Sequence, residues 1–418
     1  MKKLVSLILV VLLCGVGSVM SAVSEKDIEN YNQGMEALKE NNFSNAYKYF
    51  KKSKKYAEAQ FELGNLYANG NGVKQNDKDA ISWYEKAEAQ GLGKATFCLG
   101  KMYEKQAVKA TGKKISEKKS LEEKAVKYYK KSAEGGYAEA QCCLGDLYYG
   151  GIFVKQDKEL AYEWYNKASI KKDKKAQYRL AKMFESGDSV IKNQNKAIKL
   201  YKSSAASGYD KAQYELGNYY YSKGNHKAAV RYYSDAAEQG NADAQYELGC
   251  MYSSGDSVEA NFETAFDYFR KAESGGNKDA IYMLGDMYYS GLGRNEDKTK
   301  AFECYKKYAE LKNDLDAQYK VGYMYSKGEG VGQDINEARK WFELAAKQGH
   351  KDAQTILKSL RIPNRQDNKE SKGKKEDKKD NKQDNLKESK DNVAGNKAVE
   401  KKAEEVGKKK VFSRGFRE

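Results

Sequence analysis

The strongest constraint on the fold of this 418-residue chain is a spacing of residues that occurs eight times. Each copy starts with Ala, has Leu or Val four residues later, Gly or Ala next, and an aromatic residue three positions further on. The copies begin at Ala59, Ala95, Ala140, Ala176, Ala212, Ala244, Ala280 and Ala317. Most begin 36 residues after the previous one, and such a period is typical of stacked structural units. We therefore look for function on a repeated surface.

A second pattern follows each first one: an Ala with bulky residues three and four positions later, as in Ala80, Trp83 and Tyr84. In both patterns apolar residues recur at spacings of three, four and seven, so each repeat is predicted to be two amphipathic helices. A Gly inside the first helix, such as Gly217, costs roughly 1 kcal/mol relative to Ala. That cost is tolerable if the missing side chain lets the second helix approach, so we expect tight antiparallel hairpins.

Short glycine-containing segments such as Gly70-Asn71-Gly72-Val73 separate the two helices of most repeats. Glycine at a helix end can adopt a positive φ and stop the helix. The combined pattern, Ala-x3-Leu-Gly-x2-Tyr, then Gly-x-Gly-Val, then Ala-x2-Trp-Tyr, resembles the Sel-one-like repeat, a relative of the tetratricopeptide repeat, over roughly residues 57–358. The resemblance implies an all-α, right-handed solenoid of helix-turn-helix repeats.

The predicted solenoid covers residues 57–360, and a tetratricopeptide-like helical pair precedes it over residues 23–56. Two repeats depart from the family pattern. The repeat from Ala212 is short and lacks the Gly-rich segment, and the repeat from Ala95 carries extra residues near Lys105–Ser120. Because that stretch lacks an apolar period, we expect a longer exposed loop, with a contact to a partner as the alternative.

Residues 1–22 have the features of a secretory signal. Met1-Lys2-Lys3 precedes an apolar run over residues 4–16, which small residues follow up to Ala22. The run is too short to span a membrane comfortably. We therefore expect an exported protein, periplasmic or secreted, with a lipid anchor at Cys14 or a retained helix as alternatives to cleavage.

The composition changes abruptly after the repeats. Residues 361–418 contain 19 Lys and Arg against 12 Asp and Glu, with Phe412 and Phe416 as the only aromatic residues. Such a segment buries too little apolar surface to offset its ordering entropy, so it is predicted to be disordered. Its basic end, Lys408–Arg417, is a candidate for docking on an anionic surface, and an inert tail is the alternative.

The sequence offers little for catalysis. Its two histidines, His226 and His350, belong to no spaced metal-binding or nucleophile motif. We therefore predict a protein that is not an enzyme and has no metal or cofactor. Cysteine-rich relatives in the family include secreted hydrolases of the beta-lactamase-like kind, but the cysteine pairs of those relatives are missing here. The five cysteines after the signal, Cys98 among them, are expected mainly as small core residues.

The net charge of +16 and pI of about 9.1 suit an acidic partner. The predicted signal argues against nucleic acid. We predict an adaptor that binds a protein or peptide along its concave surface. The alternative is an envelope-polymer binder that holds peptidoglycan or an anionic glycan, partly through the basic tail.

The candidate groove lies on the first helices, opposite the residues that face the second helices. With the leading Ala counted as position 3, positions 2, 5, 9 and 12 lie on that side, which lines the concave groove in tetratricopeptide-like solenoids. The candidate residues are Tyr149, Tyr178, Lys182, Tyr214, Asn218, Tyr221, Tyr246, Tyr282, Tyr289 and Tyr319. Tyrosine offers contact area at low entropy cost together with a hydroxyl.

These candidates are of two kinds. The tyrosines at position 5 also belong to the ordinary family pattern, so packing between helices is the alternative for them. For the other five, Tyr149, Lys182, Asn218, Tyr221 and Tyr289, no packing role is expected, so ligand binding is favoured and a structural role is the alternative.

Overall fold

The computed structural model describes residues 23–110 and 115–361, and within these ranges it consists of α-helices joined by short turns. The helices are α2 (Glu25–Lys39), α3 (Phe43–Lys52), α4 (Ala57–Asn69), α5 (Asp77–Ala89), α6 (Gly93–Lys109), α7 (Ile115–Glu134), α8 (Ala138–Gly150), α9 (Lys158–Ile170), α10 (Lys174–Ser186), α11 (Gln194–Ala206), α12 (Asp210–Ser222), α13 (His226–Glu238), α14 (Ala242–Ser254), α15 (Phe262–Ser274), α16 (Asp279–Ser290), α17 (Lys298–Lys312), α18 (Leu315–Lys327), α19 (Ile335–Lys347) and α20 (Lys351–Arg361). The all-α prediction is therefore confirmed.

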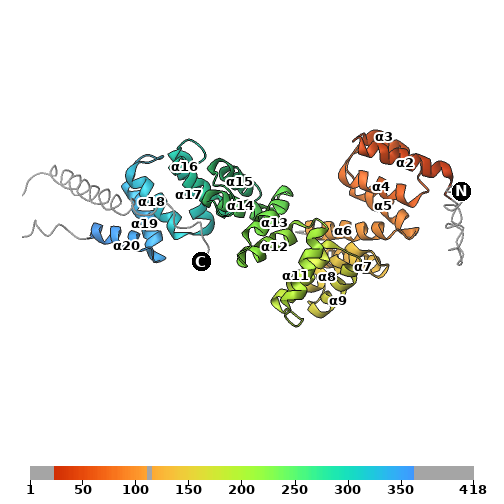
Figure 1. The fold of residues 1–418 in the computed structure, drawn as a ribbon. Helices are drawn as coiled ribbons and strands as arrows, with labels where there is room; N and C mark the ends of the chain where they lie inside the picture. The colour runs from red at the N-terminus through yellow and green to blue at the C-terminus, as the bar shows by residue number, and fades with distance from the viewer. Residues whose placement is uncertain (1–22, 111–114, 362–418) are drawn as a thin grey trace, which may run out of the picture. The chain divides into compact units, whose positions relative to one another are not determined.

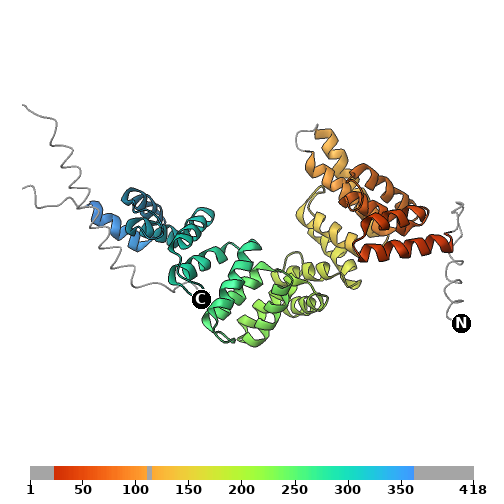
Figure 2. The ribbon, with the colours of Figure 1, turned by 90° about the horizontal axis from the view of Figure 1, so that it is seen from above.

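The chain divides into two compact units between Ser203 and Ser204, within α11. In the N-terminal unit α2 packs on α3, α4 on α5, α6 on α7, and α8 on α9. In the C-terminal unit α12 packs on α13, α14 on α15, α16 on α17, and α18 on α19, followed by the single helix α20 (Figures 1 and 2). Each pair forms a helical hairpin. We number the repeats 1 to 8, from α4 and α5 to α18 and α19.

The first helix of most repeats ends where glycine takes a left-handed conformation. Gly70 has φ +75° and its backbone N–H donates to Leu66, which stops α4. Asn76 then accepts hydrogen bonds from the first turn of α5 and begins the second helix. The corresponding turn between α18 and α19 contains Gly330. A Cβ on this glycine would lie 2.1 Å from the carbonyl oxygen of Lys298 in the preceding repeat. The turn therefore also packs against the neighbouring repeat.

Glycine inside the first helix allows the close approach that the sequence predicts. A Cβ on Gly217 would lie 2.4 Å from ring carbons of Tyr233 in the paired helix α13, and one on Gly64 would lie 2.5 Å from Tyr84. In repeats 2, 3 and 6 to 8 a Cβ on the equivalent glycine would be 2.6 to 2.9 Å from the second-helix aromatic ring. The seven glycines therefore confirm the tight hairpins, and in repeat 4 the position is Ala181.

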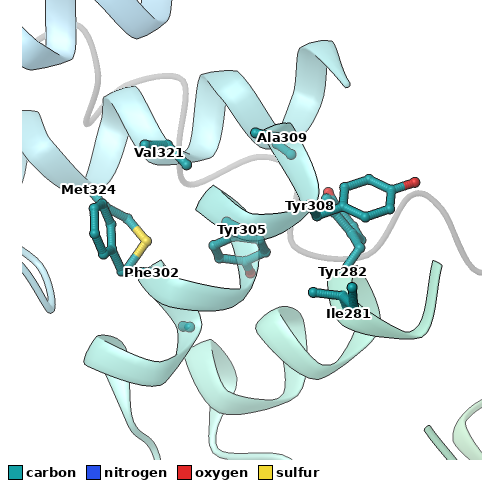
Figure 3. Close-up of a cluster of buried hydrophobic side chains, with 10 residues drawn as sticks. Ile281, Tyr282, Phe302, Tyr305, Tyr308, Ala309, Val321 and Met324 are labelled. Carbon is teal, nitrogen blue, oxygen red and sulfur yellow. The ribbon is translucent and has the colours of Figure 1, made fainter. Parts of the chain in front are cut away.

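The cores are chains of small clusters, each shared by neighbouring helices. In repeats 7 and 8, Tyr305 is 1% exposed and belongs to a cluster with Phe302, Val321 and Met324 from α17 and α18. Figure 3 shows this cluster, with Tyr282 and Tyr308 together at one end. Because every cluster spans adjacent helices, each repeat is stabilised mainly by its neighbours.

The predicted exposed loop at Lys105–Ser120 is wrong. Helix α6 continues to Lys109 and α7 begins at Ile115, so the extra residues mostly lengthen two helices. Ala107 is fully buried and Ala110 is 3% exposed. Lysine and alanine make up half of this stretch and favour helix whether or not an apolar period is present.

No helix within residues 23–110 or 115–361 is long and apolar enough to cross a membrane. The signal predicted over residues 1–22 lies outside the described residues. Of the tail predicted over residues 361–418, Arg361 is the last residue of α20, and the rest lies outside the described residues.

Candidate binding face

The sequence places the candidate residues on the side of each first helix opposite the small and apolar residues that pack on the second helix. We call this side the first-helix face. In the N-terminal unit it is formed by α4, α6, α8 and α10, and in the C-terminal unit by α12, α14, α16 and α18. The N-terminal unit carries Tyr149, Tyr178 and Lys182; the C-terminal unit carries Tyr214, Asn218, Tyr221, Tyr246, Tyr282, Tyr289 and Tyr319.

The tyrosines at position 5 lie at the edge of this face and pack on the core aromatic ring of their own repeat. Ring centroids are 5.9 Å apart for Tyr178 and Tyr201, and 6.0 Å apart for Tyr214 and Tyr233. The corresponding distances for Tyr246, Tyr282 and Tyr319 are 5.7, 5.6 and 5.6 Å. Each of these side chains therefore packs within its hairpin, which is the packing role that the sequence left open.

Tyr282 departs from the other candidates. It is 7% exposed and packs between Tyr305 and Tyr308, with ring centroids 5.6 and 5.3 Å away. A ligand on the face reaches little of such a side chain. The prediction that Tyr282 lines the groove is wrong, because Tyr308 replaces a smaller residue at that end of α17 and covers the ring.

Position 9 supplies the hydrogen-bond acceptor for a buried tyrosine hydroxyl. The Tyr233 hydroxyl donates to Asn218 at 2.8 Å, and Tyr84 donates to Asn65 at the same distance. Tyr165 and Tyr305 donate in the same way to Asp146 and Asp286. Asn218 therefore has a role in helix packing, against the expectation that it is free of one, because a buried hydroxyl needs an acceptor.

Tyr149 forms part of a link between repeats. Its hydroxyl donates to Asp188 in the turn of the next repeat at 2.7 Å, and the Lys158 ammonium donates to both oxygens of the same carboxylate at 3.0 Å. Lys158 also lies 5.4 Å from the Tyr149 ring centroid. We call this tyrosine, base and acid arrangement the inter-repeat clasp.

The clasp recurs in every second repeat. In repeats 5 and 6 Tyr221 stacks on His226 at 4.4 Å and His226 Nδ1 lies 2.6 Å from Asp256. Although burial alone would raise the pKa of Asp256, His226 and then Tyr221 hold this pKa below its usual value. In repeats 7 and 8 the members are Tyr289, Lys298 and Glu329, with a tyrosine-to-acid distance of 2.7 Å. All three tyrosines therefore have structural partners, and the expectation that they lack a packing role is wrong.

The clasp gives Asp188 a pH-dependent contribution to stability. Hydrogen bonds from Tyr149 and then from Lys158 hold the pKa of this carboxyl below its usual value. A carboxyl with a lowered folded-state pKa stabilises the fold above its unfolded pKa of about 3.9, and this contribution is lost as the pH falls through the folded-state value.

We expect Tyr149→Phe to lower the urea midpoint of unfolding more at pH 7 than at pH 3, because the hydroxyl stabilises the ionised carboxyl and this contribution decreases as the pH falls below about 3.9. Tyr148→Phe is the control, since Phe184 occupies the equivalent position in repeat 4. An equal loss at both pH values would show that the effect comes from packing alone.

Lys182 is the candidate with the largest access to solvent in the N-terminal unit. Its side chain is 44% exposed and its ammonium donates to Glu185 on the same helix at 2.8 Å. Glu185 in turn accepts from the hydroxyl of Tyr201 at 2.9 Å. The lysine therefore belongs to a small polar network at the edge of α10 and still presents its charge outward.

The described residues contain no group of three or more His, Cys, Asp or Glu side chains that is placed to hold a metal. Burial raises the pKa of Cys143 and of Cys304 to about 12, so these thiols stay protonated near neutral pH. Cys142 is buried in a core cluster. The chemistry available on the face is therefore hydrogen bonding, ion pairing and aromatic contact.

Stacked helical hairpins with a polar and aromatic first-helix face define a repeat protein of the tetratricopeptide-like class. The chain belongs to the Sel1 repeat family. The Sel1 repeat model matches residues 57–92, 114–137, 138–173, 174–209, 210–241, 242–277, 278–313 and 315–350. The first helix of repeat 2, α6, lies outside the matched residues.

Solved structures with similar chains include two that cover most of this one. A protective antigen of uropathogenic Escherichia coli strains with an SLR fold is 23% identical, with a TM-score of 0.44, over 93% of this chain and 88% of that one. A Sel1 repeat protein from Oxalobacter formigenes is 24% identical, with a TM-score of 0.49, over 84% and 98%. Helicobacter pylori cysteine rich protein B is 32% identical over 31% and 93%, with a TM-score of 0.25. No curated protein sequence matches the chain.

Proposed function

We propose that the protein is an exported scaffold that binds a protein or peptide partner along its first-helix faces. The observation that carries the proposal is the composition of those faces. Tyrosine edges, amides and partly exposed charges lie on successive helices, whereas the apolar side chains are turned into the hairpins. An extended peptide can use such a surface through hydrogen bonds and aromatic contact.

Membership of the family supports a binding role, since Sel1 repeat proteins generally mediate protein–protein interactions. It also supports a scaffold in preference to an enzyme. Export rests on residues 1–22, whose charged start and short apolar run are typical of a secretory signal.

The second candidate ligand is an envelope polymer such as an anionic glycan, which would bind through the basic tail. The face of the C-terminal unit argues against it. Asp243, Asp279 and Asp316 occupy the same position of successive first helices there and would repel an anionic polymer. A protein or peptide partner therefore fits the described surface better.

Crosslinking in the native host, followed by mass spectrometry, tests the proposal. We expect Lys182→Ala to reduce the captured partner by about threefold at low salt if the partner is anionic there, because an exposed ion pair contributes up to about 1 kcal/mol and is screened by salt. The matched control is Lys199→Ala, an exposed lysine on the second helix of the same repeat.

Equal capture by the Lys182 variant, the control and the wild type would show that this part of the face does not bind the partner. Recovery of cell-wall glycan in place of protein would favour the second candidate.

In the same preparation, a mature chain that begins near Val23 is expected if the signal is cleaved, and an intact Met1 on cytoplasmic protein would exclude export.

A further inference from the structure

The first-helix face of the C-terminal unit carries a row of carboxylates that the N-terminal unit lacks. Position 2 of four successive first helices holds Asp243, Asp279, Asp316 and Asp352. In repeats 1 to 4 the same position alternates in charge, as Glu58, Lys94, Glu139 and Lys175. Repeat 5, the first repeat of the C-terminal unit, holds Lys211 at this position, so the row begins with repeat 6. The helix dipole favours an acid at this position in every repeat, so it does not explain why the sign alternates up to repeat 5 and is constant after it.

The acids of this row remain accessible. Asp243 is exposed, and the side chains of Asp279 and Asp316 are 46% and 36% exposed. Asp243 accepts a hydrogen bond from the amide of Asn277 at 2.8 Å, a donor that does not neutralise it. Asp279 accepts from Tyr308 at 2.8 Å and lies 3.3 Å from Lys312. His350 lies 3.3 Å from Asp316.

The row runs beside the position-5 tyrosines. Burial first, and then neighbouring groups that include Glu247 and Asp279, raise the pKa of Tyr246. Burial first, and then the charge of Asp352, raise the pKa of Tyr319. Asp279 and Asp352 thus each lie within electrostatic reach of a tyrosine on the preceding first helix. A surface with negative charges and half-buried aromatic rings fits a basic segment that also carries aromatic residues.

The chain contains such a segment. Residues 408–417 read Lys-Lys-Lys-Val-Phe-Ser-Arg-Gly-Phe-Arg, with five positive charges, no acid and two phenylalanines. Elsewhere after residue 361 acidic and basic residues are interleaved. Residues 362–407 separate this segment from the end of α20. A random coil of that length has an end-to-end distance of about 40 Å. Helix layers are on the order of 10 Å apart, so every position of the acidic row is within reach.

We propose that residues Lys408–Arg417 bind the acidic first-helix face of the C-terminal unit of the same chain and compete there with the external partner. The proposal rests on the proposed function, because the segment would cover the face that captures the partner. Attachment to the same chain raises the effective concentration of a segment to about 1 mM. A segment with an intrinsic Kd of about 0.1 mM would then be bound about ten times more often than free and would weaken partner binding about tenfold.

The test uses the full chain and a fluorescent peptide with the sequence of residues 408–417. In the tail-neutral variant, Lys408→Gln, Lys409→Gln, Lys410→Gln, Arg414→Gln and Arg417→Gln remove the segment's charge. We expect fluorescence anisotropy to show that this variant binds the peptide about tenfold more tightly than the wild type, because its face is open. A peptide with the same five residues replaced by Gln should not bind either chain. This comparison does not depend on any change within the folded repeats.

A second variant tests whether the peptide binds the acidic face. It combines Asp243→Asn, Asp279→Asn and Asp316→Asn in the tail-neutral chain. Asparagine keeps the acceptors for Asn277 and Tyr308, and removal of three charges should weaken peptide binding at least roughly tenfold. The matched control removes three exposed acids from second helices by Glu238→Gln, Glu303→Gln and Glu310→Gln. It should bind the peptide as the tail-neutral chain does.

Equal peptide affinity for the wild-type and tail-neutral chains would overturn the proposal, and so would a face variant that binds normally. A dimer in sedimentation velocity that disappears in the tail-neutral chain would also overturn it, because the segment would then occupy another copy. If the peptide fails to bind but crosslinking still captures a partner through the face, only this inference fails. If the peptide binds and no partner is captured, the proposed function fails and the tail contact stands.

Discussion

We expect Gly217→Leu to lower the free energy of unfolding by about 3 kcal/mol, at the upper end of the usual cost of overpacking. A Cβ at this position would already lie 2.4 Å from two ring carbons of Tyr233. The ring has little room to move, because Tyr233 is 2% exposed and its hydroxyl is held by Asn218. The branched side chain must therefore push α12 and α13 apart. Thermal and urea unfolding of the purified chain would measure the loss.

Two glycine controls separate steric overlap from changes in helix propensity. Gly217→Ala adds only the first carbon and should cost less than Leu, since alanine also favours the helix by about 1 kcal/mol. Gly332 lies in a turn with nothing within 4 Å of an added Cβ, so Gly332→Ala should leave the transition almost unchanged. A wild-type transition for Gly217→Leu would contradict the close approach of the two helices.

The sequence was sufficient to predict the helical hairpins because the residues that form each hairpin lie within one repeat. The small residue at position 8 and the bulky residue on the second helix recur together in each repeat, and their periodicity fixes which faces meet. The pairing of Gly64 with Tyr84 follows from the spacing of these residues alone. The loop prediction for the insertion in repeat 2 was wrong because it relied on apolar periodicity. That pattern does not detect a helix that is extended by lysine, glutamate and alanine.

The candidate site was harder to predict because its polar contacts join different repeats. Tyr149 and Asp188 are 39 residues apart, and nothing near Tyr149 in the sequence indicates that partner. One signal was present. Tyr149, Tyr221 and Tyr289 occur in every second repeat, and an acid stands in the turn of each repeat that follows, at Asp188, Asp256 and Glu329. Comparison of alternate repeats, in place of adjacent ones, would have suggested the clasp.

Position 9 illustrates a second limit. Helical geometry placed Asn218 on the side away from the second helix, which is correct for its Cα. The long side chain of Tyr233 passes over Gly217 and reaches the amide, so the absence of a side chain at position 8 brings position 9 into the hairpin. The face that remains for a ligand is consequently narrower than the sequence implied, with its most accessible charges at Lys182 and at the row from Asp243 to Asp352.

The largest electrostatic effect is expected at Lys320. Its ammonium contacts Asp286 in the preceding repeat, whose side chain is 12% exposed, and lies 4.6 Å from the Tyr282 ring centroid and 4.5 Å from that of Tyr305. The Tyr305 hydroxyl donates to the same carboxylate at 2.6 Å. Lys320→Met would leave a nearly buried carboxylate without its cation, which typically costs about 3 kcal/mol. Urea unfolding would show the loss.

A double-mutant cycle identifies the source of this loss. Asp286→Asn keeps an acceptor for Tyr305 and removes the charge, so the double variant with Lys320→Met should recover more than half of the stability that Lys320→Met loses. The remaining loss is the contact of the ammonium with the two rings. Lys307 pairs with Glu273 at 2.7 Å between two second helices, and the lysine side chain is 55% exposed, so Lys307→Met should change stability little. No recovery in the double variant would mean that the rings, and not Asp286, account for the role of Lys320.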